Sequence, residues 1–463
     1  MRQPTIGLLP LYMKLYDDIR GEKRPRIEGF YGIVARELEK RCISVVTVPI
    51  CRVKNEFAAA VKKFEESDVD AIVTLHVAYS PSLESAEALA GTSLPLIVCD
   101  TTPVYSFSTD QEPEELLFNQ GIHGVQDMCN LLIRNGKSFE IVVGHWEKSD
   151  VLDQTAGLVR AARMASHMRR MKAGLIGTPF EGMGDFNVPP ERLKRTIGLE
   201  VVSLDPARYL ELATSVTDED IRREREEDRK RFLFDGLDEE VYLRSLRAGL
   251  AVEKWIDSEG LSAFSYNFLD FNRKASLNVV PFLAASKMMA RGIGFAGEGD
   301  ILTASLVSAI ALYNPDTSFT EMFCPDWAHD AIFLSHMGEM NHRLASGKPK
   351  LVEMNYPYGD ADNPVIATGR FKAGEVLLVD LAPVGEREYR LIMAPARILD
   401  VPEDSKWQAR VRAWMAPPIP LRDFLGAYSR HGGTHHLALT YGASKETVEA
   451  FGRIMGWETV TIE

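Results

Sequence analysis

Short apolar runs alternate with amphipathic segments over the first 170 residues of the chain. The apolar runs are rich in Val, Ile and Leu, and they predict β-strands at residues 5–12, 44–50, 71–77, 95–100 and 140–145. Between them, segments such as GFYGIVARELEKR and NEFAAAVKKFEES carry apolar residues at helical spacing. This alternation predicts repeated β–α units on a parallel sheet that helices cover on both faces.

The later parts of the chain show two further patterns. A second α/β stretch has expected strands at 172–177, 199–205 and 261–268, and its segment TDEDIRREREEDRKRF predicts a solvated helix because charges of both signs recur at helical spacing. After about residue 318, short strands such as PVIATGRF and GEVLLVDLAPV are separated by Gly, Pro and Asp turns, as in an antiparallel barrel or sandwich. The expected fold class is α/β, with two Rossmann-like parallel α/β domains followed by a C-terminal antiparallel β-barrel domain. The expected boundaries are 1–170, 171–318 and 319–463.

The segment RGIGFAGEGD, residues 291–300, has glycines at the spacing of a dinucleotide-binding loop. Such a loop needs a strand before it and a helix after it, so that the helix N-terminus faces a pyrophosphate. Apolar residues recur at helical spacing on both sides, so we expect a loop between two helices, with Asp300 as the N-cap of the second. The glycines would then allow a tight turn that leaves Glu298 in a cleft, and an exposed loop glutamate is the competing interpretation.

Six of the ten histidines gather in the C-terminal part: His329, His336, His342, His431, His435 and His436. Glu321 and Asp326 lie among them, and two Glu with two His would suit Mn²⁺, Co²⁺ or Mg²⁺. The absence of thiolate ligands argues against a structural zinc site. If His435 and His436 lie on a strand, they point to opposite faces and cannot both face one metal, so at most one of them would then be a ligand.

Charge and cysteine content narrow the function classes. The formal net charge of −13 repels nucleic-acid backbones, so we expect no nucleic-acid partner. No run of about 18 apolar residues is present to span a bilayer, so we expect no membrane association. The N-terminus lacks a secretory leader pattern, and the five cysteines include no C-x-x-C pair. These features predict reduced thiols in a cytoplasmic protein.

Four motifs together resemble the L-arabinose isomerase family, within the L-arabinose/L-fucose isomerase-like fold: GIGFAGEGD, TEMF…SHMGE, GGTHH and NQGIHG. The resemblance implies that Glu298, Glu321, His336 and His436 hold a divalent cation, with Mn²⁺ expected and Co²⁺ or Mg²⁺ open. It also implies that Glu298 and Glu321 are the catalytic carboxylates.

The resemblance implies sugar contacts as well. His123, with Gln120 nearby, would reach a neighbouring subunit's active site, so the expected assembly is a homo-oligomer, a hexamer. His435 would bind sugar hydroxyls, and Phe268 would form an aromatic wall. Leu15 fits the family pattern, whereas Met13 stands where a sugar-contacting Gln is usual. After Glu321, MFCPD replaces the family's D-Y-T-Y and removes a tyrosine.

The implied activity is metal-dependent aldose–ketose isomerisation of a monosaccharide. A proton moves between C2 and C1 through an enediolate, with the two Glu and the cation assisting. A metal-dependent epimerase or dehydratase on the same scaffold is the first alternative, and a non-catalytic sugar-binding protein is the second. The sequence leaves open which aldose is the substrate, which metal is native and which Glu is the base.

Overall fold

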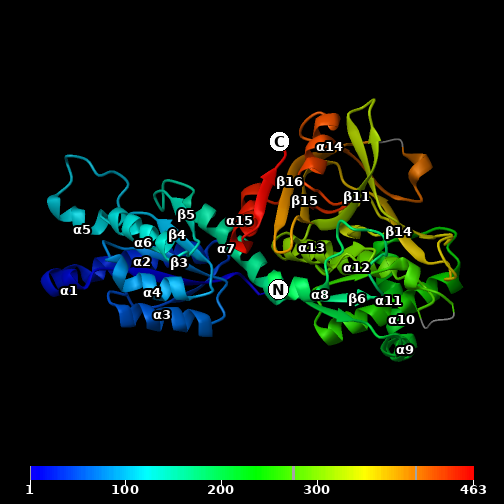
Figure 1. The fold of residues 1–463 in the computed structure, drawn as a ribbon, viewed down its shortest axis with the longest axis horizontal. Helices are drawn as coiled ribbons and strands as arrows, with labels where there is room; N and C mark the ends of the chain where they lie inside the picture. The colour runs from blue at the N-terminus through cyan, green and yellow to red at the C-terminus, as the bar shows by residue number, and fades with distance from the viewer. Residues whose placement is uncertain (1, 274–276, 402–403) are drawn as a thin grey trace. The chain divides into compact units, whose positions relative to one another are not determined.

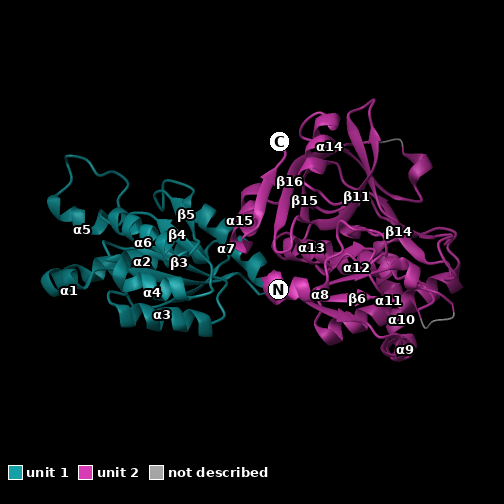
Figure 2. Ribbon diagram, viewed as in Figure 1, with its two compact units in different colours: residues 1–166 teal, residues 167–463 magenta. Residues whose placement is uncertain are grey.

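The computed structural model describes residues 2–273, 277–401 and 404–463. Contacts within the chain divide it into two compact units, Met1–Ser166 and His167–Glu463 (Figure 2). The three expected domain boundaries remain predictions. Among the described residues, no helix combines the length and apolar character that crossing a membrane requires.

Unit 1 contains a five-stranded parallel sheet in the order β2-β1-β3-β4-β5, so every strand expected in this region is confirmed (Figure 1). The strands are β1 (Thr5–Leu11), β2 (Ser44–Thr47), β3 (Ala71–His76), β4 (Leu96–Asp100) and β5 (Glu140–Val143). The helices are α1 (Lys14–Arg20), α2 (Arg24–Glu39), α3 (Lys54–Glu66), α4 (Ser82–Gly91), α5 (Leu116–Asn119) and α6 (Ile122–Arg134), and α7 (Val151–Arg170) follows β5.

The helical spacing in NEFAAAVKKFEES explains how α3 packs. Phe57, Ala60, Val61 and Phe64 lie on one face of the helix and join the hydrophobic core beneath β1, β3 and β4. The strand order of this unit reverses between β1 and β3, which is where ligands bind in open α/β sheets. The segments after β1 and β3 are therefore the places in unit 1 to examine for substrate contacts.

Unit 2 begins with a four-stranded parallel sheet in the order β10-β9-β6-β7. Its strands are β6 (Lys172–Ile176), β7 (Glu200–Ser203), β9 (Ala263–Tyr266) and β10 (Gly294–Gly297). Its helices are α8 (Pro190–Thr196), α9 (Pro206–Thr214), α10 (Asp218–Arg231), α11 (Glu239–Glu259), α12 (Phe282–Ala290) and α13 (Ile301–Tyr313). The three expected strands are confirmed, and β10 is an addition.

The presence of β10 shows that the expected helix-to-helix loop was wrong. A strand runs through the glycines, because its pairing with β9 gives residues 294–297 backbone partners despite their weak strand propensity. The turn into α13 is made instead by Glu298 and Gly299, which both have positive φ. Asp300 caps α13 as predicted, since its Oδ1 accepts a hydrogen bond from the Thr303 N–H at 2.8 Å. A carboxylate at this N-cap disfavours a bound pyrophosphate there.

The rest of unit 2 forms a ten-stranded mixed sheet in the order β19-β16-β15-β18-β11-β12-β17-β14-β13-β8. The strands are β8 (Leu233–Phe234), β11 (Thr317–Asp326), β12 (Ala331–Ser335), β13 (Lys350–Glu353), β14 (Val365–Arg370), β15 (Gly374–Pro383), β16 (Tyr389–Ile398), β17 (Val411–Ala416), β18 (His436–Tyr441) and β19 (Glu458–Thr461). The helices are α14 (Leu421–Arg430) and α15 (Lys445–Met455). The chain is therefore mixed α/β, while a closed antiparallel barrel remains a prediction.

Helix α13 lies between the two sheets of unit 2 and contacts strands of both. Its residues 301–311 are all buried, which explains why the sequence DILTASLVSAIALY is apolar on every side. Its N-terminus follows β10 directly. Side chains at this turn can therefore meet side chains from the ten-stranded sheet.

Helix α10 is largely exposed, as its charge pattern predicts, with one exception. Asp228 is fully buried, and its Oδ2 lies 2.6 Å from Lys287 Nζ and accepts a hydrogen bond from the Tyr242 hydroxyl at 2.9 Å. Glu224 lies 3.0 Å from the same ammonium group. One buried cation thus holds α10 against α12.

Candidate metal centre and active site

Five side chains with metal-binding groups converge in unit 2: Glu298, Glu321, His336, His435 and His436. They form two overlapping sets, Glu298–His435–His436 and Glu321–His336–His436, in which the potential ligand atoms lie within 4.8 Å of one another. Strand pairing explains part of this convergence. Glu321 in β11 pairs with His436 on one side and with Ser335, the neighbour of His336, on the other.

Glu298 reaches the cluster from the turn after β10. Its φ of 64° is unusual for a residue with a side chain, and such strain occurs mainly where a fold has a functional reason to keep it. The Phe180 N–H donates to the Glu298 carbonyl at 2.8 Å and helps to hold this conformation. The carboxylate Oε2 lies 3.2 Å from His436 Nε2 and 3.5 Å from His435 Nε2. The residue is only 8% exposed, so the competing interpretation as an exposed loop glutamate was wrong.

Each imidazole has a carboxylate at its Nδ1. Glu339 Oε2 lies 2.7 Å from Nδ1 of His336, Asp300 Oδ2 lies 3.0 Å from Nδ1 of His436, and Asp185 Oδ2 lies 2.7 Å from Nδ1 of His435. Carboxylates in this position orient metal-binding histidines and leave Nε2 for the ligand.

Two buried atoms at the centre, Oε2 of Glu298 and Nε2 of His436, face each other at 3.2 Å, and neither makes a well-aligned hydrogen bond to any described residue. A buried polar atom without a partner costs about 1–3 kcal/mol, so native proteins rarely retain one without a reason. One atom is a carboxylate oxygen and the other is an imidazole nitrogen that can bind a metal once it loses its proton, and these are ligand types that Mn²⁺, Co²⁺ and Mg²⁺ take in proteins. The residues present therefore fit a divalent cation.

The pKa values at the centre reflect close packing of opposite charges. Burial alone would raise the pKa of Glu298, but interactions with His435 and His436 lower it well below its usual range. Burial raises the pKa of Glu321. For His436, burial would lower the pKa, but Asp300 and Glu298 raise it to about 9. For His435, burial would likewise lower the pKa, but Asp185 and Glu298 raise it to about 10.

Aromatic rings and a glycine shape the surroundings of the imidazoles. Phe319 presents its edge to His336 and His436, with ring centroids 4.8 and 5.0 Å away, and Phe186 stacks on His436 at 5.1 Å. A Cβ at Gly297 would lie 2.8 Å from His336 Cε1, so no larger residue fits at this strand position. Phe323 lies in a β-bulge two residues after Glu321 and is 44% exposed. The segment MFCPD thus places an apolar ring at the edge of the centre.

The four predicted metal ligands therefore lie together, whereas the condition behind the argument about the histidine pair, that both residues lie on a strand, is not met. His435 precedes β18, whose first residue is His436, so the alternation of side chains along a strand does not apply to it. The two ring centroids are 4.2 Å apart, and both Nε2 atoms face Glu298. Phe268 is also in unit 2, where it is 9% exposed and packs against Phe180 and Tyr358.

The remaining predicted sugar-binding residues belong to unit 1. His123 stacks on Tyr79 with ring centroids 4.4 Å apart, and Gln120 Nε2 donates to the Tyr16 hydroxyl at 3.0 Å. Met13 is the N-cap residue of α1, and Leu15 in that helix is 48% exposed.

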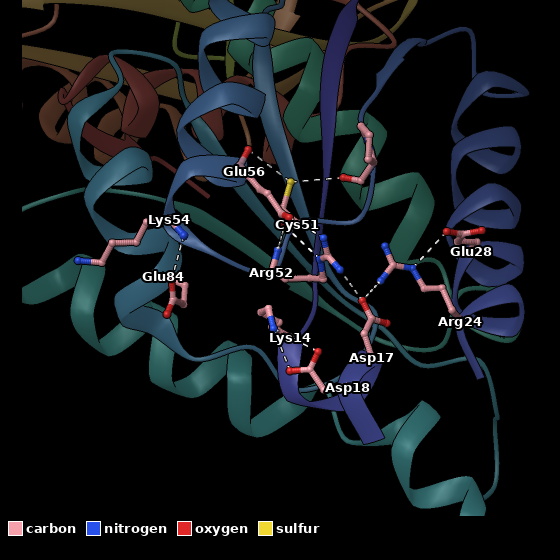
Figure 3. A network of polar contacts seen from close by, with 11 residues as sticks. Lys14, Asp17, Asp18, Arg24, Glu28, Cys51, Arg52, Lys54, Glu56 and Glu84 are labelled. Atoms are coloured by element: carbon pink, nitrogen blue, oxygen red, sulfur yellow. Dashed lines mark hydrogen bonds and ion pairs between the residues drawn. The ribbon is translucent and has the colours of Figure 1, made fainter. Parts of the chain in front are cut away.

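Ion pairs hold α1 in unit 1. Figure 3 shows Asp17 of this helix between Arg24 and Arg52, and Lys14 paired with Asp18. These contacts fix the segment that carries Met13 and Leu15, next to the reversal of strand order between β1 and β3.

Sequence reasoning missed several residues of the centre. Glu339 lies inside the SHMGE motif, close to the predicted ligand His336, and Asp300 follows the predicted ligand Glu298 but was interpreted only as a helix cap. Their closeness in sequence to a predicted ligand is the signal that could have identified both residues. Asp185 is 250 residues from its partner His435, and no local pattern indicates that contact.

Family comparisons agree with this geometry. The sequence models of the L-arabinose isomerase central and C-terminal domains match residues 194–314 and 316–458. L-arabinose isomerase 2 of Bacillus licheniformis is 27% identical over 357 residues, covering 74% of each chain. L-arabinose isomerase of Shouchella clausii is 24% identical over 360 residues, covering 76% of this chain and 73% of the relative. L-arabinose isomerase of Oceanobacillus iheyensis is 26% identical over 357 residues, covering 74% of each chain.

Two adjacent domain models of one family thus match the part of the chain that holds the centre. The chain belongs to the L-arabinose isomerase family, and the resemblance inferred from its motifs is confirmed.

Proposed function

We propose that this protein is a metal-dependent aldose–ketose isomerase that acts on L-arabinose or a related aldose. The observation that carries the proposal is the convergence of Glu298, Glu321, His336 and His436, whose potential ligand atoms on Glu298 and His436 are buried without a well-aligned hydrogen bond. Family membership supports the reaction class, since the curated relatives are L-arabinose isomerases.

The four converging residues would hold the cation, with Mn²⁺ as the proposed ion and Co²⁺ or Mg²⁺ able to use the same donors. When bound, such an ion supplies a Lewis acid that polarises a carbonyl and stabilises developing negative charge on oxygen. Glu339 and Asp300 keep the imidazoles of His336 and His436 oriented toward it.

The chain's own side chains would move the protons. A carboxylate within hydrogen-bond reach can take the proton from C2 of an aldose and return it to C1. We assign this work to Glu298 and Glu321, the two carboxylates whose oxygens face the centre. His435 would bind a sugar hydroxyl beside them, and Phe268 would pack against the carbon skeleton.

We also propose that the active protein is a homohexamer in the cytoplasm with shared active sites. His123, with Gln120 nearby, would contact the sugar bound in another subunit, and Met13 and Leu15 would be further sugar-contacting positions. The division into three domains at about residues 170 and 318 belongs to this proposal. So does a closed C-terminal barrel, which the extra pairing of β16 with β17 supports.

The first test is ketose formation from a panel of aldopentoses and aldohexoses. We expect EDTA to abolish conversion and added Mn²⁺ to restore it for at least one sugar, because the bound cation would polarise the reacting carbonyl. Chromatography with mass detection identifies a ketose of unchanged mass. Mn²⁺ binding without conversion of any sugar would contradict the proposal and favour an epimerase, a dehydratase or a sugar-binding protein.

Shared active sites predict complementation between two inactive variants. Glu298→Gln and His123→Asn should each be inactive alone. If equal amounts of the two are mixed and reassembled, about a quarter of the sites should combine a normal Glu298 with a normal His123. Activity of about that fraction is expected in the mixture. Mixing that exchanges subunits without restoring activity would show that each site uses residues of one subunit.

Mn²⁺ affinity should rise with pH. In the metal-free protein the pKa of His436 is about 9, because Asp300 and Glu298 outweigh the effect of burial, so its Nε2 carries a proton at neutral pH. That proton must leave before Nε2 can bind an ion, so affinity should increase by about tenfold per pH unit for each proton displaced. Calorimetric titration in buffers of different ionisation enthalpy counts these protons. An affinity that stays constant between about pH 6 and pH 8 would contradict this ligand assignment.

A further inference from the structure

The loop between β6 and α8, residues 177–189, contacts the centre at three points. The Phe180 N–H donates to the Glu298 carbonyl at 2.8 Å, and Phe186 stacks on the ring of His436 at 5.1 Å. Asp185 bonds to His435. The start of the loop is itself held, since the Thr178 N–H donates to Asp270 Oδ2 at 2.8 Å. One loop of the α/β part of unit 2 thus contacts the turn after β10 and the histidine pair of the ten-stranded sheet.

The contact between Asp185 and His435 has two parts. Oδ2 of Asp185 accepts from the backbone N–H of His435 at 3.0 Å and lies 2.7 Å from its Nδ1. The same oxygen therefore fixes both the main chain and the ring, and it determines that Nε2 is the nitrogen directed toward Glu298. The side chain of Asp185 is 37% exposed, so it does not serve to fill the core.

We propose that Asp185 is a positioning residue that orients His435 for its contact with the substrate. The inference rests on the proposed function and extends it to a loop residue that no motif identified. Asp300 and Glu339 make the equivalent contact to Nδ1 of His436 and His336. Asp185 is the third member of this arrangement, and it acts on the one histidine of the cluster that is outside the proposed four-ligand set.

This division of roles gives two distinct expectations. Loss of a carboxylate behind a metal-binding histidine typically lowers metal affinity or activity by about 10–100-fold. Asp300→Ala should therefore weaken Mn²⁺ binding. Asp185→Ala should lower kcat/KM for the aldose by about 10–100-fold and leave the Mn²⁺ dissociation constant within about threefold of the wild-type value.

The chain offers a conservative variant and a matched control. Asp185→Asn keeps one acceptor oxygen in the same place and should recover part of the loss. Asp326→Ala removes another Asp–His pair, since Asp326 Oδ2 lies 2.9 Å from Nδ1 of the exposed His329 in the turn between β11 and β12. The control should leave kinetics and metal binding unchanged.

The experiment combines three measurements on the full-length protein: aldose kinetics, Mn²⁺ titration followed by electron paramagnetic resonance, and ¹⁵N NMR of the histidine rings. Asp185→Ala should shift the ring signals of His435, and Asp326→Ala should not. Unchanged ring signals and kinetics in Asp185→Ala would overturn the proposal, and so would a loss of Mn²⁺ affinity equal to that of Asp300→Ala. If the wild-type protein converts no aldose, the proposed function fails, and the ring signals still decide whether Asp185 orients His435.

Discussion

Replacing Glu298 by Gln is expected to lower turnover by at least about 10³-fold while the fold is retained, since general base catalysis alone contributes about 10²–10⁴. The substitution keeps the shape of the side chain but removes the charge that faces His435 and His436. It also removes one of the two buried ligand atoms at the centre that lack a well-aligned hydrogen bond. Steady-state kinetics at saturating Mn²⁺ measure the loss, and circular dichroism checks the fold.

The control for this variant is Glu375→Gln, which removes an exposed carboxylate paired with Arg397 on β16. Its turnover should equal that of the wild type. Near-normal turnover in Glu298→Gln would contradict the role assigned to this carboxylate, and the reaction would then have to use Glu321 alone.

Replacing Lys287 by Met should destabilise the protein by about 3–5 kcal/mol, the usual cost of removing one partner from a buried ion pair. Lys287 is the cation that lies 2.6 Å from the fully buried Asp228. Burial already raises the pKa of Asp228 despite the nearby ammonium group, so its pKa should rise further in the variant. Without Lys287, the ionised form of Asp228 is the one that destabilises the folded protein. The loss of unfolding free energy should therefore be larger at about pH 8 than at about pH 5. Urea unfolding at both values measures the difference.

Two further variants separate charge from packing. Adding Asp228→Leu to Lys287→Met should restore much of the stability, because the fully buried carboxylate is then removed and Glu224 keeps its pair with Arg231 at 3.1 Å. Lys445→Met breaks an exposed pair with Glu463 and should leave the unfolding free energy nearly unchanged. Equal losses in Lys287→Met and Lys445→Met would show that the buried pair has no special energetic weight.

The fold could be predicted from the sequence where each element buries a regular apolar face. The strands of unit 1 and most strands of the large sheet are short apolar runs between turn residues, so local pattern and burial agree. Strand β10 could not be predicted in this way, because GFAG has little strand propensity and forms a strand only through its pairing with β9. Its buried neighbour α13 shows no amphipathic face, because sheets cover it on both sides.

The candidate site was predictable where ligands lie in motifs and unpredictable where contacts join distant segments. Glu298, Glu321, His336 and His436 could be named, and the structure brings their ligand atoms together. The orientation of His435 could not be predicted. It depends on the start of β18 at His436, one residue later, and on the contact with Asp185 from another loop. Strand periodicity describes residues within a strand and gives no information about the residue before it.

The four proposed ligands come from two different sheets. Glu298 follows the last strand of the parallel sheet, and Glu321, His336 and His436 belong to or adjoin strands of the large mixed sheet. A cation bound by all four would act as a non-covalent cross-link between the layers on either side of α13. Its binding free energy then adds to the resistance of this unit to unfolding, by about 2.7 kcal/mol at a free ion concentration 100 times the dissociation constant. If the cation binds as proposed, heat tolerance and ion supply would be coupled in this molecule, independently of whether a sugar is present.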